Sequence, residues 1–351
     1  MKNDNNQETF LALVQAGLWE TEARLLLYEG VDYSEVFRSA EEQSVVGLVA
    51  AGLEHTDGVP YETKLKFIGY ASQIQQRNMA MNRFIAELVA KLQSEGITPL
   101  LVKGQGVAQC YKRPLWRVSG DVDLLLGAEK YEKAIDYLTL LSSNCKPERK
   151  YSKEIGFYLG DILVELHGTL RTGLSSCIDK IVDEVQNDTF RNDKTRVWHN
   201  GETEVHLPTP DNDVFFVFTH FIKHLYKEKM SLRQMCDWSR LLWIYRNEID
   251  SALLEKRIHK AGLLGEWKTF AALAVGYLGM PVEDMPLYDE SDCWHKKGEV
   301  LLNFILKGRK PNKVRDSMFF LGQFPCNTLS FLPSIFFNVN RLKIKERLIE
   351  K

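Results

Sequence analysis

The chain has 351 residues, enough for two domains or for one domain with extensions, and its 44% apolar and 26% charged residues are those of an ordinary globular protein. A formal net charge of −2 at pH 7 provides no general attraction to nucleic acid or to a membrane surface. The six cysteines are scattered without a Cys-x-x-Cys pair, which argues against a disulfide framework or a zinc site and indicates reduced thiols.

The sequence predicts neither a signal peptide nor a transmembrane segment. Residues 1–8 are polar, and no apolar run approaches the roughly 20 residues that are needed to span a bilayer. We therefore expect a cytoplasmic protein.

Residues 1–95 are predicted to form an N-terminal helical region. Apolar residues at intervals of three and four indicate short helices over 9–53, and a longer helical stretch follows over 61–94. The stretch ends at Glu95-Gly96, since glycine commonly follows the last turn of a helix.

Residues 96–207 are predicted to form a core of mixed strands and helices. A strand, a helix, a strand and a helix are expected in that order over 97–102, 104–111, 120–126 and 129–141. Two hairpins follow, one turning at Gly160-Asp161 and the other at Asn200-Gly201, which is a strong hairpin signal. After Pro208 the pattern changes to long helices, so that 208–351 form a C-terminal helical region. This order predicts an α+β fold.

The strand at 120–126 carries two acidic residues, Asp121 and Asp123, separated by one apolar residue. Side chains at i and i+2 of a strand point to the same face, with α-carbons about 6.5–7 Å apart. Two carboxylates on one face of a buried strand are costly without a cation, and the hard ion Mg²⁺ prefers carboxylate oxygen and also holds phosphates. The pair therefore predicts phosphoryl or nucleotidyl transfer.

A third acid, Glu165, lies in the apolar segment Ile162-Leu-Val-Glu-Leu-His167, where it shares one strand face with His167. Taken by itself, a single glutamate in such a strand is about as commonly an edge residue that faces solvent as it is a functional residue. Its position one helix and one strand after the aspartate pair favours a metal ligand or a base.

Taken in order, these motifs resemble the uncharacterised nucleotidyltransferase family of the DNA-polymerase-β-like nucleotidyltransferase superfamily. The residues that carry the resemblance are Lys103-Gly104, Tyr111, Arg117, Gly120, Asp121-Val-Asp123 and Val164-Glu165-Leu166-His167. The superfamily pattern is a Gly-Gly or Gly-Ser turn that opens a helix, an Asp-x-Asp or Asp-x-Glu strand, and a third acid on another strand. Lys103-Gly104 departs from that turn, as the narrower family does. The resemblance implies a polymerase-β-like core, a small mixed sheet with helices, between the two helical regions.

The resemblance also implies Mg²⁺-dependent transfer of a nucleoside monophosphate from a nucleoside triphosphate to a hydroxyl acceptor, such as a small molecule, a sugar or a protein. Asp121, Asp123 and Glu165 are then catalytic metal ligands, with two Mg²⁺ ions expected when nucleotide is bound. Glu165 would lie near the acceptor hydroxyl and help to remove its proton. The nucleotide-binding candidates are Lys103, Gly104, Arg117 and Gly120.

Two of these candidates have simpler explanations. Lys103 is equally consistent with a surface residue at the end of a strand. Arg117 is consistent with an ion pair to Asp121 or Asp123 in the absence of metal, although its place four residues before the acid pair favours a phosphate contact.

The resemblance extends more loosely into the C-terminal region. His220 and His224 are four residues apart, as are Arg233 and Asp237, so each pair shares one helix face. A zinc-protease motif is excluded because Phe221 replaces the required glutamate. A structural polar network and an acceptor-side wall of the active site both stay open. The acceptor-side candidates are His167, His220, His224, Arg233 and Asp237.

Other functions are less well supported. A catalytically silent nucleotide- or partner-binding module of the same fold is the main alternative, because the glycine turn is altered. A small-molecule kinase is disfavoured, since His167-Gly-Thr169 lacks the catalytic aspartate and an Asp-x-Asp strand has no place in that fold.

The net charge disfavours a nucleic acid partner. The tail at 307–351, with ten basic and three acidic residues among phenylalanines, is consistent with a peripheral membrane contact or with an aromatic helix face packed on the protein.

Overall fold

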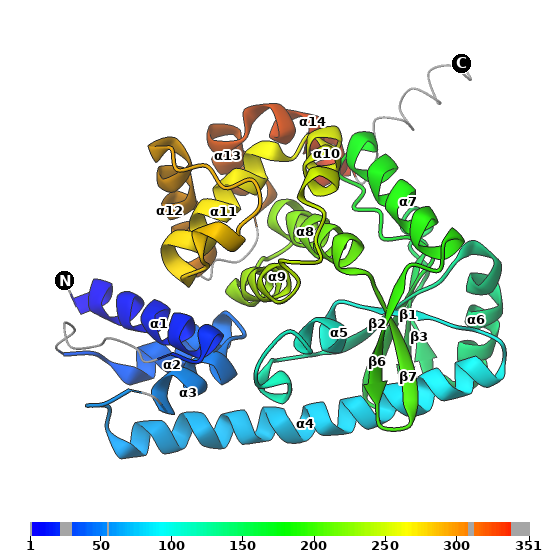
Figure 1. The fold of residues 1–351 in the computed structure, drawn as a ribbon, viewed down its shortest axis with the longest axis horizontal. Helices are drawn as coiled ribbons and strands as arrows, with labels where there is room; N and C mark the ends of the chain where they lie inside the picture. The colour runs from blue at the N-terminus through cyan, green and yellow to red at the C-terminus, as the bar shows by residue number, and fades with distance from the viewer. Residues whose placement is uncertain (1, 22–29, 55, 308–311, 338–351) are drawn as a thin grey trace.

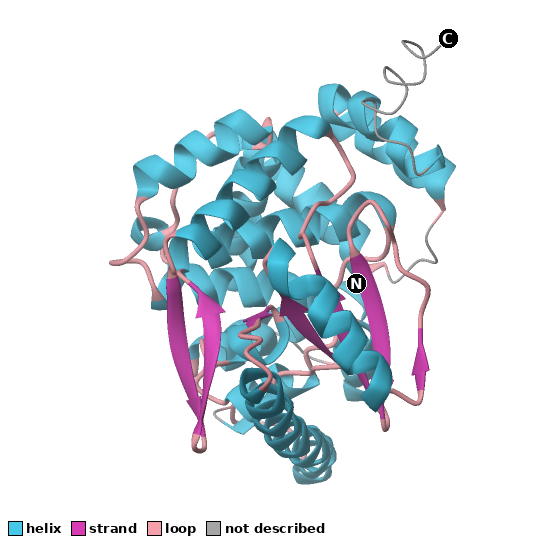
Figure 2. Ribbon diagram, turned by 90° about the vertical axis from the view of Figure 1, so that its right-hand side faces the viewer, coloured by secondary structure: helices cyan, strands magenta, loops and turns pink. Residues whose placement is uncertain are grey.

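A computed structural model describes residues 2–21, 30–54, 56–307 and 312–337 of the chain (Figure 1). The sheet is flanked by helices, with the N-terminal helices at one end of the molecule and the C-terminal helices above the strands (Figure 1 and Figure 2). The fold is α+β, as the sequence predicts. Among the described helices, none is long and apolar enough to cross a membrane.

The sheet has seven strands in the order β3-β4-β5-β2-β1-β7-β6. It is mixed, because β2 pairs in parallel with β5 and β1 with β7, whereas the other neighbours are antiparallel. The strands are β1 Leu100–Val102, β2 Asp121–Leu125, β3 Asn144–Cys145, β4 Glu154–Leu159, β5 Ile162–His167, β6 Thr195–Asn200 and β7 Thr203–Pro208.

Strand β2 has the alternation that its sequence predicts. Val122 and Leu124 are buried in the apolar cluster on one face of the sheet, together with Val164 and Leu166 of β5. The aspartates of β2 therefore lie on the opposite face. Both predicted hairpins are present, as β4–β5 and β6–β7.

The helices of the N-terminal region and the core are α1 Lys2–Trp19, α2 Tyr33–Glu42, α3 Val46–Glu54, α4 Tyr61–Ser94, α5 Gly104–Ala108, α6 Ala128–Leu141 and α7 Ser176–Arg191, with a 3₁₀ turn, η1, over Pro114–Trp116. The C-terminal helices are α8 Pro210–Lys227, α9 Leu232–Ile244, α10 Ser251–Ala261, α11 Leu264–Leu278, α12 Asp292–Leu306, α13 Lys313–Gln323 and α14 Pro325–Phe337, with a second 3₁₀ turn, η2, over Val282–Asp284. The helix predicted over 61–94 is confirmed as α4, whereas the one predicted over 104–111 ends early as the five-residue α5.

Helix α7 was not predicted, although its sequence carries a clear signal. Ser175 accepts a hydrogen bond from the backbone N–H of Ile178 and caps the helix. The buried residues Ile178, Ile181, Val182 and Val185 then recur at helical spacing.

Helix α4 joins two hydrophobic clusters. At about 1.5 Å per residue its 34 residues extend about 50 Å along the base of the molecule (Figure 1). Phe67 and Ile74 pack with the N- and C-terminal helices, whereas Ile85 and Leu92 pack under the sheet. The N-terminal and C-terminal helices therefore share one core, and the division at residues 95 and 207 stays a prediction.

The tail at 307–351 is described only in part, since 308–311 and 338–351 lie outside the described residues. Within α13 and α14, Phe320 and Phe331 are buried and pack against the ring of Tyr226 in α8. The aromatic side chains of these two helices thus contribute to the core.

The close contact of α3 with η1 generates a test of the fold. A β-carbon on Gly47 would lie 2.0 Å from the carbonyl oxygen of Trp116, so Gly47→Ala must push α3 away from the turn that precedes Arg117. We expect the free energy of unfolding in urea to fall by about 1–3 kcal/mol. Gly69→Ala is the matched control, because Gly69 lies in α4 with no atom within 4 Å of its β-carbon position, and it should gain up to about 1 kcal/mol. Equal stabilities would contradict the packing described here.

Candidate active site

One cavity of about 350 Å³ collects most of the residues that the sequence singles out. Its walls come from the polar face of β2 and β5, from the start of α5, and from α8 and α9. Among the candidates, Gly120 is outside the lining. Those that line the cavity are Lys103, Gly104, Arg117, Asp121, Asp123, Glu165, His167, His220, His224, Arg233 and Asp237.

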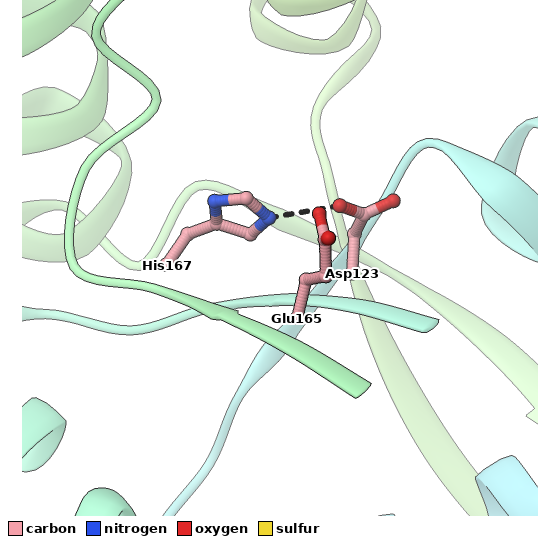
Figure 3. A group of neighbouring side chains, drawn as sticks. All are labelled: Asp123, Glu165 and His167. Carbon is pink, nitrogen blue, oxygen red and sulfur yellow. Dashed lines mark hydrogen bonds and ion pairs between the residues drawn. The ribbon is translucent and has the colours of Figure 1, made fainter. Parts of the chain in front are cut away.

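The acidic cluster is built by the parallel pairing of β2 and β5. Asp123 lies opposite Glu165 in the register, and Asp121 lies two residues earlier in β2, opposite Leu163. The ligand atoms of Asp123, Glu165 and His167 are all within 4.8 Å of one another (Figure 3). His167, expected on the acceptor side, therefore lies within the acidic cluster, whereas Asp121 lines the cavity just outside this compact group.

Asp123 has two donors on one oxygen. Lys103 Nζ is 2.7 Å from Asp123 Oδ1, and His167 Nε2 is 2.8 Å from the same atom. The Lys103 side chain is only 15% exposed, so the interpretation of Lys103 as a surface residue is wrong.

The backbone of Lys103 is unusual. Its φ of 59° and ψ of −145° lie in a region that is essentially restricted to glycine. Lys103 ends the turn from β1 into α5, and Gly104 follows with a φ of 39°. This conformation costs on the order of 1–3 kcal/mol and is maintained by the surrounding structure.

The three carboxylates differ in their electrostatic environment. Burial alone would raise the pKa of Asp123, but the Lys103 ammonium and the His167 imidazole outweigh it and lower that pKa. Burial raises the pKa of Asp121 and of Glu165, and the Asp123 carboxylate raises both further. Asp123 is thus the ionised centre of the cluster, and its two acidic neighbours lack equivalent compensation.

Arg117 is held away from the acidic cluster by a different partner. Its Nε and second terminal nitrogen donate to the two oxygens of Asp237 at 2.6 and 2.7 Å, in a buried bidentate pair. Tyr111 donates its hydroxyl to the same carboxylate at 2.8 Å. The expected alternative of an Arg117 pair with Asp121 or Asp123 is therefore incorrect, and the pair instead ties the segment before β2 to α9.

Arg233 differs from Arg117 in having no carboxylate partner among the described residues. It donates to the carbonyl oxygen of Val118 at 2.7 Å, while its Nε is buried without a hydrogen-bond partner. Asp237, which shares its helix face, is taken by Arg117. Arg233 thus brings a guanidinium without a contacting carboxylate to the cavity, close enough to Asp121 for their charges to interact.

His220 and His224 form a hydrogen-bonded chain with Glu228. His224 Nδ1 is 2.8 Å from a Glu228 oxygen, and the Nε2 atoms of the two histidines are 3.0 Å apart. If the Glu228 carboxylate accepts from Nδ1, then His224 Nε2 accepts from His220 Nε2–H, and His220 Nδ1 keeps a lone pair. Burial, and then the charge of Lys103, lowers the pKa of His220, which favours this neutral form. Glu228 was not predicted from the sequence, although it continues the spacing of four residues.

A family model described as an uncharacterised nucleotidyltransferase matches residues 29–279. The matched segment covers all strands of the sheet and every residue of the cavity wall named above. Comparisons with curated proteins and with solved structures gave no match.

The strained backbone at Lys103 predicts that glycine is more stable than alanine at this position, the reverse of the usual order. Lys103→Ala and Lys103→Gly both remove the ion pair with Asp123, but only alanine keeps the strain. We expect Lys103→Gly to be the more stable in urea by about 1–3 kcal/mol. The control is Lys223 in the interior of α8, where glycine should be the less stable by about 1 kcal/mol. A higher stability of Lys103→Ala than of Lys103→Gly would contradict the strain.

The unequal environments of Asp121 and Asp123 predict opposite effects of neutralising them. From the sequence alone, Asp123→Asn is expected to relieve repulsion without large loss of stability; the structure assigns that effect to Asp121. Asp121→Asn should raise the free energy of unfolding at pH 7, and the gain should disappear as the pH falls and the parent carboxyl takes up its proton. Asp123→Asn leaves the Lys103 ammonium unpaired and should cost about 3–5 kcal/mol. Urea titrations of the metal-free protein at pH 7 and pH 4 test both, and a stabilising Asp123→Asn would contradict the assignment.

Proposed function

Because the chain belongs to the uncharacterised nucleotidyltransferase family, we propose that its cavity transfers a nucleoside monophosphate from a nucleoside triphosphate, such as ATP, to a hydroxyl acceptor. The observation that carries this proposal is the meeting of Asp121, Asp123 and Glu165 on one face of the sheet, within a single cavity. A folded protein gains nothing in stability from three neighbouring carboxylates, so the arrangement points to a cationic ligand.

The donor set suits Mg²⁺. Carboxylate oxygens are the ligands that this hard ion prefers, and the raised pKa values of Asp121 and Glu165 indicate that a cation would relieve the local excess of negative charge. Asp121, Asp123 and Glu165 would hold the ion. When bound, it neutralises charge on the phosphates and on the departing group.

The triphosphate has cationic and backbone donors nearby. Arg233 offers a guanidinium without a carboxylate partner, and planar guanidinium groups suit phosphate oxygens. Gly104 lines the cavity without a side chain, so that a phosphate can approach the backbone there. Arg117 acts indirectly in this proposal, because its pair with Asp237 fixes the segment that leads into β2.

In the proposed reaction the acceptor oxygen attacks the α-phosphorus. A new oxygen–phosphorus bond forms as the bond to the α,β-bridging oxygen breaks, and pyrophosphate leaves with those electrons. The acceptor proton passes to Glu165, the acid that the proposal places near the acceptor hydroxyl. His220 and His224 line the wall that α8 contributes to the cavity, where the His220 imidazole is suited to hydrogen-bond an acceptor hydroxyl.

The acceptor is proposed to be a small molecule, a sugar or a protein side chain in the cytoplasm. The near-neutral net charge supports this choice over nucleic acid, and the scattered cysteines support the compartment.

A silent nucleotide-binding module is the second candidate function. It is favoured by the contacts of Asp123, whose Oδ1 is already taken by Lys103 and His167. The two functions predict the same nucleotide binding and differ in whether pyrophosphate is released.

The test is a thermal-shift screen of the four ribonucleoside triphosphates with and without Mg²⁺, followed by assay of pyrophosphate release with candidate acceptors. We expect a rise in melting temperature that requires both nucleotide and Mg²⁺. At saturating nucleotide and Mg²⁺, Glu165→Gln should slow pyrophosphate release by about 10²–10⁴-fold, because the proton acceptor is lost together with one metal ligand.

The matched control is Glu132→Gln on the exposed surface of α6, which should behave as the parent does. Binding without pyrophosphate release, for every acceptor class, would favour the silent module. No stabilisation by any nucleotide would reject both functions.

A further inference from the structure

The Lys103 ammonium lies in the part of the cavity that a shared cation would be expected to take. It contacts Asp123 Oδ1 at 2.7 Å, and the charges of Asp121 and Glu165 also act on it. When Lys103 is protonated and the three carboxylates are ionised, the four groups have a net charge of −2, which one divalent ion would neutralise.

Placing an ammonium here is costly for the protein. The Lys103 side chain is mostly removed from water, and its backbone adopts a conformation essentially restricted to glycine. Glycine at position 103 would connect β1 to α5 at a lower energetic cost, because glycine adopts this backbone conformation without strain. The cost is therefore associated with the charged side chain and its position.

Asp121 offers the cavity a carboxylate that Lys103 does not contact. Among the described residues, the Asp121 carboxylate makes no hydrogen bond or ion pair, although it lines the cavity. Arg233, the nearby guanidinium without a carboxylate partner, is available there for phosphate oxygens. A divalent ion held by Asp121, Glu165 and the second oxygen of Asp123 would thus meet the triphosphate without displacing Lys103.

We propose that Lys103 serves as a built-in monovalent cation in place of one of the two divalent ions, so that the site takes a single divalent ion with its nucleotide. This inference rests on the proposed function and revises the expectation of two Mg²⁺ ions. Lys103 acts here as a positioning residue, because it holds Asp123 ionised and oriented through a tethered charge that cannot dissociate.

The test counts ions. Mn²⁺ replaces Mg²⁺ because its free and bound forms are distinguished by electron paramagnetic resonance, and the α,β-methylene analogues of the four nucleoside triphosphates prevent turnover. The parent protein should bind one Mn²⁺ per chain in the presence of analogue. Lys103→Met should bind two, because the substitution vacates a position among the carboxylates and leaves their charge uncompensated.

Lys223→Met is the matched control, since Lys223 lines the same cavity from α8 and lies 3.7 Å from Glu154, outside the acidic cluster. It should bind one Mn²⁺, as the parent does. Lys103→Gln replaces Lys103→Met if the latter does not fold.

Two Mn²⁺ per chain in the parent would overturn the inference while leaving the proposed function intact. A single Mn²⁺ in both the parent and the folded Lys103 variant would also overturn it, since Lys103 would not be the group that excludes the second ion. Absence of analogue-dependent Mn²⁺ binding in the parent would reject the proposed function together with the inference.

Discussion

The arrangement of this protein depends on the electrostatic compensation of one buried carboxylate. Asp123 is almost removed from water, and an isolated ionised carboxylate in that position would be strongly unfavourable. Lys103 and His167 supply the compensation, and each comes from a strand or turn next to β2 in the sheet. The order β5-β2-β1 thus decides the electrostatics of the site as well as the packing of the core. The strained backbone of Lys103 is one cost of that arrangement.

A second buried ion pair connects the sheet to the helices above it. Arg117 precedes β2 and Asp237 lies in α9, so their bidentate contact fixes the position of the helical layer relative to the acidic cluster. Tyr111 completes the arrangement by donating to the same carboxylate. Because Asp237 is taken, Arg233 on the same helix lines the cavity without a contacting carboxylate among the described residues. Asp237 pairs with Arg117 and not with Arg233. Arg117 therefore has a structural role, whereas Arg233 is suited to bind an anion.

The cavity is also a product of how the helical regions pack. Helix α4 contributes to the core beneath the sheet and to the core shared by the N- and C-terminal helices, so it links the two. The helix α8 that carries His220 and His224 is anchored in the shared core by residues such as Phe218 and Phe221, whose rings pack against Trp238 of α9. The polar side of α8 is thereby directed to the acidic cluster on the sheet. A wall of the candidate active site therefore depends on the apolar contacts of the helix that carries it.

Local sequence patterns determined much of the fold and the acids of the site. Alternation with a period of two placed Asp121 and Asp123 on one face, Asn200-Gly201 identified a hairpin, and helical spacing with a glycine stop gave the bounds of α4. Only the tertiary structure decided which charged side chains pair with each other. Lys103 and Asp123 are separated by 20 positions and Arg117 and Asp237 by 120, and no local periodicity specifies which distant charges meet. Strand order and helix packing bring those groups together, which is why the sequence indicated the residues of the site but not the ion pairs that set their charge.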